Sequence, residues 1–302
     1  MIEAPQYTCP QSLVTIGIPT FNRPDGLRKS LEFIVKQTYT NLEIVISDNC
    51  STDIRVQEII HEFSARDQRI RSFRQQENIG LENNFNFVYQ LAKGPYFIWM
   101  SDDDYFEADY IEKCVDFLES HPGFVLCSGV AKYYDGHKFL FTEPMFKVHQ
   151  NSILGRLFQY FHFVQKNGNF YGVFRTGFLS TPPLPDILGS DWVFMAKMSV
   201  NGKLSYIDST FYHRSIAGNS QTRKKMIEKA GLKNIKKLFF ETYLAYIIST
   251  NIFTDPEIRK KVGWFNGQLF KLMVFIQINW KLLFKFIKKK YRQLLKINSQ
   301  GI

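Results

Sequence analysis

The chain has 302 residues, of which 45% are hydrophobic and 16% aromatic, so it can bury a full core and is not intrinsically disordered. Its net charge of +10 is uneven: residues 1–220 hold 20 Lys and Arg against 24 Asp and Glu, whereas residues 221–302 hold 18 against 4. The four cysteines form no CxxC pair, which excludes a disulfide framework or a zinc site and favours a reducing compartment. The N-terminus carries no secretory signal pattern, so we expect a cytoplasmic protein.

Apolar runs alternate with helical patterns over the first 130 residues. We expect strands at 13–19, 42–47, 70–73, 96–100 and 124–130. Helices are expected to begin at Pro24, after Asp53, at Leu81 and near Ile111. This alternation predicts an α/β fold, with a mostly parallel sheet flanked by helices.

Polar clusters follow three of these strands, at Thr20–Arg23, Asp48–Asp53 and Asp102–Asp104. Ligands bind beyond the carboxyl ends of parallel strands, so this edge of the sheet is the expected site. The three adjacent carboxylates repel one another unless a cation or strong donors neutralise them, which favours a divalent cation that bridges substrate phosphates. A solvated acidic turn that caps the next helix is the alternative.

Residues 131–220 are less regular. A strand is expected at 173–175, after a glycine-rich and aromatic segment, and Pro182–Pro185 is a turn-rich linker. An amphipathic helix is expected from Ser190, with Val193, Ala196 and Val200 on its apolar face.

Five segments together resemble the family 2 glycosyltransferases: PTFNR at 19–23, SDNCSTD at 47–53, NIG at 78–80, SDDD at 101–104 and GSDWVFMAKMSVNGKL at 189–204. Those enzymes have the GT-A fold and use nucleotide-sugar donors. They invert the configuration of the anomeric carbon that they transfer. The resemblance covers about residues 13–215. It implies a GT-A domain at 1–220 and a separate basic helical region at 221–302.

The resemblance also implies roles for the residues near the donor. Pro19, Thr20, Arg23 and Asn78 border the nucleotide. Asp48 matches the aspartate that accepts a hydrogen bond from the base imide, which favours UDP- or dTDP-sugars because neutral cytosine lacks that donor.

The same resemblance implies a metal site. Asp102 lies near the ribose and the metal, and Asp104 is a direct ligand to Mg²⁺ or Mn²⁺, whereas the participation of Asp103 is less certain. His213 would complete the coordination, or would bond to neighbouring backbone instead. If His213 is not a ligand, the neighbouring Arg214 is expected to face the diphosphate instead.

Asp191 stands where this family carries its catalytic carboxylate, and the resemblance makes it the general base. An ordinary first-turn acid of a helix is the alternative. The sequence departs here from the common Glu-Asp pair, because Ser190 precedes Asp191.

The C-terminal region is both aromatic and basic. Its uncharged stretch at 272–280 is shorter than the ~20 residues that a spanning helix needs. Lysines interleaved with Leu, Phe and Ile over 281–296 predict a helix in the interface of an anionic membrane. A helix packed on the catalytic domain, with a solvated basic face, is the alternative.

Taken together, these features predict a metal-assisted inverting glycosyltransferase, peripheral at the inner face of the membrane, with a glycan or lipid-linked acceptor in polysaccharide biosynthesis. No nucleic-acid reader motif occurs in residues 1–220. A sugar nucleotidyltransferase is disfavoured, because PTFNRPDG at 19–26 is not a glycine-rich basic phosphate loop. A non-enzymatic membrane protein with a degenerate fold is the remaining alternative. No motif names the sugar or the linkage.

Overall fold

The computed structural model describes residues 11–179, 183–216 and 239–298. The chain forms two compact units. The first comprises Met1–Lys147, Gly168–Pro183 and Leu204–Gly218, and the second comprises Val148–Asn167, Leu184–Lys203 and Asn219–Ile302. The boundary expected near residue 220 lies outside the described residues.

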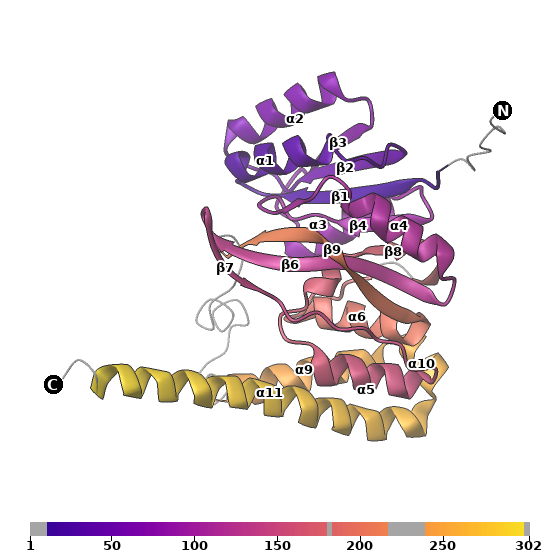
Figure 1. Ribbon diagram of the computed structural model, residues 1–302, viewed down its shortest axis with the longest axis vertical. Coiled ribbons are helices and arrows are strands. Elements are labelled where there is room, and N and C mark those ends of the chain that lie inside the picture. Colours follow the sequence, from indigo (N-terminus) through magenta and orange to yellow (C-terminus); the bar gives the residue numbers. More distant parts are fainter. Residues whose placement is uncertain (1–10, 180–182, 217–238, 299–302) are drawn as a thin grey trace, which may run out of the picture. The chain divides into compact units, whose positions relative to one another are not determined.

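The first unit is built on one mixed sheet of nine strands in the described residues (Figure 1). Its strands are β1 Val14–Thr20, β2 Leu42–Asp48, β3 Ile70–Arg74, β4 Tyr96–Trp99, β5 Tyr105–Phe106, β6 Phe124–Asp135, β7 Lys138–Thr142, β8 Val173–Arg175 and β9 Lys203–Ser215. Their order is β3-β2-β1-β4-β8-β6-β9-β5, and β7 pairs with β6.

Parallel pairing joins four of the five strands that the alternation predicted, whereas the fifth, β6, pairs antiparallel with β7 and β8. β1 pairs in parallel with both β2 and β4, and β2 with β3. The strands that follow are antiparallel: β8 pairs with β4 and β6, and β5 with β9. Because β1 and β2 run in register, Thr20 lies opposite Asp48, and the first two polar clusters meet at one sheet edge.

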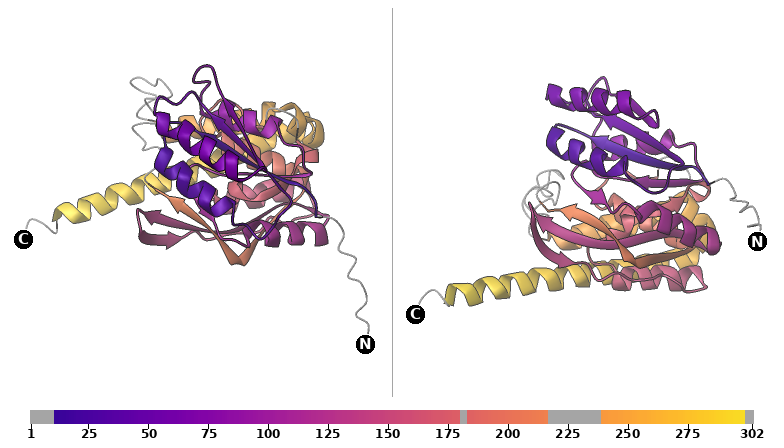
Figure 2. Two further views of the ribbon diagram at one scale, coloured as in Figure 1. Left: turned by 90° about the horizontal axis from the view of Figure 1, so that it is seen from above. Right: turned by 45° about the horizontal axis from the view of Figure 1, so that its top comes forward.

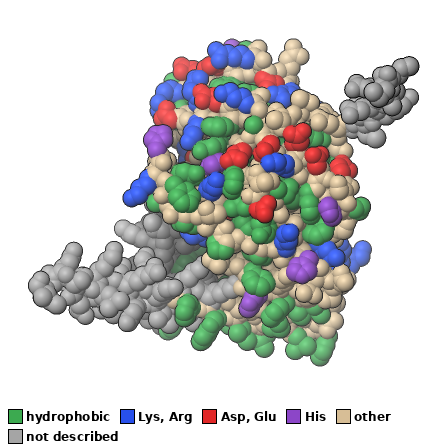
Figure 3. Space-filling model, in the orientation of Figure 1, with side chains coloured by type: hydrophobic (Ala, Val, Ile, Leu, Met, Phe, Trp, Pro, Cys, Tyr) green, Lys and Arg blue, Asp and Glu red, His purple; other side chains and the backbone are tan. Residues whose placement is uncertain are grey.

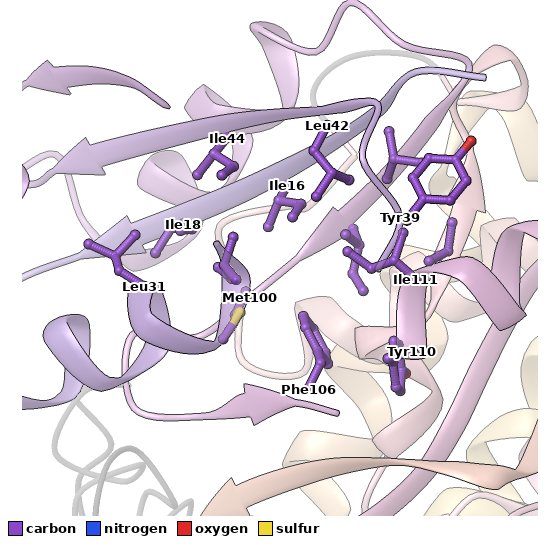
Figure 4. Packing of buried hydrophobic residues seen from close by; sticks show 14 of the residues in the cluster. Ile16, Ile18, Leu31, Tyr39, Leu42, Ile44, Met100, Phe106, Tyr110 and Ile111 are labelled. Atoms are coloured by element: carbon purple, nitrogen blue, oxygen red, sulfur yellow. The ribbon is translucent and has the colours of Figure 1, made fainter. Parts of the chain in front are cut away.

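Helices cover both faces of the parallel strands. They are α1 Pro24–Ile34, α2 Ile54–Arg66, α3 Leu81–Gln90 and α4 Tyr110–Ser120. α1, α2 and α4 contribute to one apolar cluster with Ile16, Ile44 and Met100 of the sheet region (Figure 4). α3 packs over Gly17, where a Cβ would lie only 2.5 Å from Phe97 and 2.7 Å from Val88, so this approach needs glycine.

The described part of the second unit is helical. It holds α5 Ile153–Phe163, α6 Ser190–Asn201, α9 Phe240–Thr254, α10 Pro256–Val262 and α11 Trp264–Asn298; the 3-10 turns Gly168–Tyr171 and Thr176–Phe178 belong to the first unit. α6 packs against α5, α9 and α10. It therefore buries every residue from Val193 to Val200, and not only the apolar face that its spacing predicted. Lys197 is buried with them and forms an ion pair of 2.8 Å with Asp255.

α11 is one continuous helix of 35 residues (Figure 2). It packs against α9, α5 and α10. Within the described part of the chain, no helix combines the length and the apolar character that crossing a bilayer requires.

Candidate active site

Hydrogen bonds tie together the loops that follow β1 and β2. The Asn49 amide donates to the Thr20 carbonyl at 2.9 Å. The Asn22 amide donates to Ser51 Oγ at 2.8 Å, and its side-chain oxygen accepts from the Thr52 amide at 2.8 Å. Asn22 has φ 53°, a left-handed conformation that asparagine tolerates better than most residues. The two loops are therefore joined into one edge.

Asp48 ends β2 at this edge and is fully buried. Its Oδ1 accepts from the Ser51 amide at 3.0 Å, and its Oδ2 accepts from Gln57 Nε2 at 2.5 Å. Arg74 Nε lies 3.8 Å away. These contacts fix the direction of the carboxylate that the sequence assigned to the nucleotide base.

Asn49 brings the NIG segment to the same edge. Its Nδ2 donates to Asn78 Oδ1 at 2.9 Å, and its Oδ1 accepts from the Ile79 amide at 2.9 Å. Sequence reasoning selected Asn78 and missed Asn49. The available indication was its position directly after Asp48 within SDNCSTD.

Asp102 joins the first loop to the acidic tract. Its Oδ2 accepts from the Thr20 hydroxyl at 2.8 Å, and its Oδ1 from Arg23 at 3.3 Å. Burial raises the pKa of Asp102 to about 7, and the Arg23 guanidinium opposes the rise. Thr20, Arg23 and Asp102, which the sequence selected separately, therefore contact one another.

Asp104 faces the end of β9 instead. It accepts hydrogen bonds from the Tyr212 hydroxyl and from the Ser215 amide, the latter at 2.8 Å. Arg214 Nε lies 3.5 Å from Asp104 Oδ2, and its guanidinium packs against the ring of Tyr171. Burial raises the pKa of Asp104 to about 6, against the lowering effect of Arg214.

Asp103 is the most accessible of the three carboxylates. Its side chain is 16% exposed, against 7% for Asp102 and 3% for Asp104. It accepts from Arg23 at 2.8 Å and from Ser101 Oγ at 2.7 Å. An ion that arrives from solvent therefore meets Asp103 first.

Helix α1 sets the position of this acidic tract. A Cβ at Gly26 would lie 2.4 Å from the Asp102 carbonyl oxygen, so the helix touches the backbone of the tract. Ser30 Oγ donates to the Asp104 carbonyl at 2.8 Å. The carboxylates are thus held by backbone contacts as well as by side chains.

His213 has partners of its own. Its ring stacks on Tyr105, with the centroids 4.4 Å apart, while Nδ1 lies 3.1 Å from the Tyr134 hydroxyl and Nε2 lies 3.3 Å from Glu107 Oε1. Burial lowers the pKa of His213. The assignment of His213 as a metal ligand stays a prediction.

Among the described residues, no group of three or more His, Cys, Asp or Glu side chains could by itself hold a metal ion. The acidic tract nevertheless offers hard carboxylate oxygens, two of them on buried groups whose charge a cation would stabilise. Mg²⁺ is commonly held by one or two carboxylates together with substrate phosphates and water. The tract therefore fits a divalent cation that shares its coordination with a diphosphate.

Asp191 lies in the second unit, in the first turn of α6. The N-cap position belongs to Gly189, which has φ 81° and no side chain, so Asp191 is not the capping residue. Asn167 Nδ2 donates to Asp191 Oδ2 at 2.8 Å, and Asn167 Oδ1 accepts from the Tyr160 hydroxyl at 2.9 Å. Asn167 and Tyr160 are buried. Sequence reasoning missed both, because neither belongs to a motif.

Comparison with known proteins gives a consistent result. The sequence model of the family described as Glycosyl transferase family 2 matches residues 15–180. Glycosyltransferase GlyA of Streptococcus pneumoniae is 35% identical over 136 residues, which are 45% of this chain and 18% of that protein. The match thus spans under a fifth of that relative's length.

Solved structures share the fold at low sequence identity. S. aureus TarS 1–349 in complex with UDP-GlcNAc aligns with a TM-score of 0.60 at 18% identity, over 82% of this chain and 69% of that one. The mannosyltransferase PcManGT from Pyrobaculum calidifontis, in complex with GDP-Man and Mn²⁺, aligns with a TM-score of 0.53 at 15% identity. The alignment covers 90% of this chain and 87% of that one. The sheet, the loop edge and the family match agree: this chain is a glycosyltransferase that belongs to family 2 and has the GT-A fold.

Proposed function

We propose that this protein is an inverting glycosyltransferase that moves a sugar from a nucleoside-diphosphate donor to a glycan or lipid-linked acceptor. The observation that carries the proposal is the single edge formed by Thr20, Asp48, Asn78 and Asp102, whose loops are joined by direct hydrogen bonds. TarS, which shares the fold, was crystallised with UDP-GlcNAc, and this supports a nucleotide-sugar donor.

Asp48 supports a UDP- or dTDP-sugar. Its carboxylate is fixed by Ser51 and Gln57, and an ionised carboxylate can only accept hydrogen bonds. The imide N–H of uracil or thymine is a matching donor. PcManGT carries GDP-Man on the same fold, so the base must be decided by experiment on this chain.

The acidic tract supports a divalent cation, Mn²⁺ or Mg²⁺. Breaking the anomeric C–O bond leaves negative charge on the diphosphate, and a cation held by Asp102 and Asp104, with Asp103 at the exposed side, would offset that charge when bound. Arg23 contacts both Asp102 and Asp103 and would orient them.

Asp191 supplies the base in this proposal. It would take the proton of the acceptor hydroxyl while that oxygen bonds to the anomeric carbon from the side opposite the diphosphate, so that the configuration inverts. Asn167 donates to Asp191 Oδ2 at 2.8 Å and would orient the carboxylate for the acceptor hydroxyl.

Calorimetry with UDP, dTDP and GDP, each with and without Mn²⁺, tests the donor assignment. We expect Mn²⁺-dependent binding of UDP or dTDP. Asp48→Ala should weaken that binding by roughly 1–3 kcal/mol, the range for a hydrogen bond to a charged group. A wild-type preference for GDP would contradict the role given to Asp48.

Variants of the tract distinguish its three carboxylates. Asp104→Asn and Asp103→Asn are each compared with the wild type for Mn²⁺-dependent UDP binding, with circular dichroism as the control for folding. The predicted assignment requires Asp104→Asn to lose the Mn²⁺ dependence. If only Asp103→Asn loses it, Asp103 is the direct ligand, and Asp104 has a structural role through Tyr212 and Ser215.

The base is tested by Asp191→Asn in a transfer assay, with the acceptor found by a donor-hydrolysis screen. Loss of a general base should lower the transfer rate by roughly 10²–10⁴-fold with donor affinity unchanged. Activity within a few-fold of the wild type would assign Asp191 to the first turn of α6 as a structural acid.

A further inference from the structure

Helix α11 carries a stripe of large apolar side chains that face solvent. Phe265, Leu269, Leu272, Ile276 and Trp280 recur every three or four residues and are 54–70% exposed. This spacing places them on one side of the helix. Figure 3 shows hydrophobic side chains gathered in this part of the molecule, over α5 and the first half of α11. We call these five residues the α11 stripe.

The opposite side of α11 already holds the helix in place. Gly267, Val274 and Ile278 are buried there, and the Asn279 side chain accepts a hydrogen bond from Thr242 of α9 at 2.9 Å. The residues of the α11 stripe lie on the other side of the helix, with more than half of each exposed. A contiguous exposed apolar stripe of this size commonly marks an interaction surface.

The charge of the C-terminal region indicates which kind of partner covers the α11 stripe. From Ile258 to the end, the sequence contains eleven Lys and Arg and no Asp or Glu. A second copy laid along α11 would bring like charges together, whereas an anionic bilayer attracts them. Trp280 lies at one end of the stripe and Trp264, which is 62% exposed, adjoins the other, and tryptophan favours the membrane–water interface.

We infer that α11 lies flat on an anionic membrane, with the α11 stripe inserted among the lipid chains and the basic C-terminal half against the headgroups. From Phe265 to Trp280 the stripe would extend about 22 Å along the surface, at ~1.5 Å per residue. This arrangement is independent of the donor and base assignments. It would place a lipid-linked acceptor and the enzyme on the same surface.

Vesicle sedimentation with the full-length protein tests the inference, with phosphatidylcholine vesicles compared with vesicles that also contain phosphatidylglycerol. We expect binding to the anionic vesicles that weakens with salt. Leu269→Ser, Leu272→Ser and Ile276→Ser in one chain should lower partitioning at least tenfold. A matched chain with Ile54→Ser, Phe139→Ser and Leu140→Ser, exposed apolar residues outside α11, should bind like the wild type.

A second chain with Lys288, Lys289 and Lys290 changed to Gln should lose on the order of 10²-fold at low salt and less at high salt. Tryptophan emission gives an independent reading. The wild type should shift to the blue on anionic vesicles. Trp264→Phe with Trp280→Phe should abolish the shift, because of the two remaining tryptophans Trp99 is fully buried and Trp192 of α6 is partly buried outside α11.

Three results would overturn the inference. The first is a stripe variant that binds as well as the wild type, and the second is equal binding to neutral vesicles. The third is a wild type that ignores vesicles but is a dimer that the stripe variant converts to a monomer, which would assign the stripe to a second copy. Donor hydrolysis, measured on the same preparations without vesicles, reports separately on the proposed function.

Discussion

Asn167 illustrates how one amide can set the direction of a proposed base. Its Oδ1 accepts from Tyr160, so its NH₂ group must point at Asp191. The residue has φ 61° and is only 2% exposed, so the amide has little freedom to turn away. The contact therefore fixes the direction of the Asp191 carboxylate, the proposed base.

We therefore expect Asn167→Gly to lower kcat by roughly tenfold while KM for the donor stays unchanged. Glycine keeps the positive φ and removes only the amide. The rate should fall because the Asp191 carboxylate loses the donor that orients it. Steady-state kinetics measure this, with Tyr160→Phe as a milder variant in which the amide can flip. A wild-type kcat per folded molecule, with the loss confined to the folded fraction in circular dichroism, would show that Asn167 acts on stability alone.

At the scale of elements, the contact between α1 and the acidic tract positions the candidate metal site. Gly26 allows the helix backbone to approach the Asp102 carbonyl, and Ser30 bonds to the Asp104 carbonyl. The carboxylates follow a short β4 and have no long strand of their own. Their position therefore depends on the first turns of α1.

Gly26→Ala tests this dependence. Its Cβ would sit 2.4 Å from the Asp102 oxygen, a backbone atom that must move. We expect a loss of roughly 1–3 kcal/mol in the free energy of unfolding, as for other overpacked sites, together with weaker Mn²⁺-dependent UDP binding. Urea unfolding and calorimetry measure the two effects. Gly123→Ala is the control, because its Cβ would meet nothing within 4 Å.

At the scale of the whole molecule, two buried acids couple folding stability to pH. Burial raises the pKa of Asp102 to about 7 and of Asp104 to about 6, whereas an aspartate in the unfolded chain has a pKa of about 4. Between these values the folded state binds more protons than the unfolded state. Stability is therefore highest below about pH 4 as far as these two groups are concerned, and it falls as pH rises through 6 and 7.

We expect the protein in EDTA to lose stability, on the order of a few kcal/mol, between about pH 5 and pH 7.5. Asp104→Asn should lose less over the same interval, because one of the two groups no longer titrates. Urea unfolding at the two pH values measures this. Stability that rises over this interval in EDTA, with the same slope in Asp104→Asn, would show that neither carboxylate controls it.

The sequence by itself determined the elements of the parallel half of the sheet, its helices and the loops of the candidate site. Apolar runs and helical spacing are local patterns, and parallel strands place their carboxyl ends at one edge whatever the details of packing. The motifs 19–23, 47–53 and 101–104 therefore pointed to loops that contact one another at that edge. The family was recognisable for the same reason.

Only the tertiary structure decided which side chains meet. Tyr212 and Asp104 are 108 residues apart in sequence, and no local pattern predicts their hydrogen bond. The same holds for Asn167 beside Asp191, 24 residues away. The sequence also did not show that the α11 stripe is exposed, because the sequence of an apolar helix face is the same whether that face packs inward or lies in solvent. Periodicity records the faces of a helix, and only its neighbours decide which face remains open.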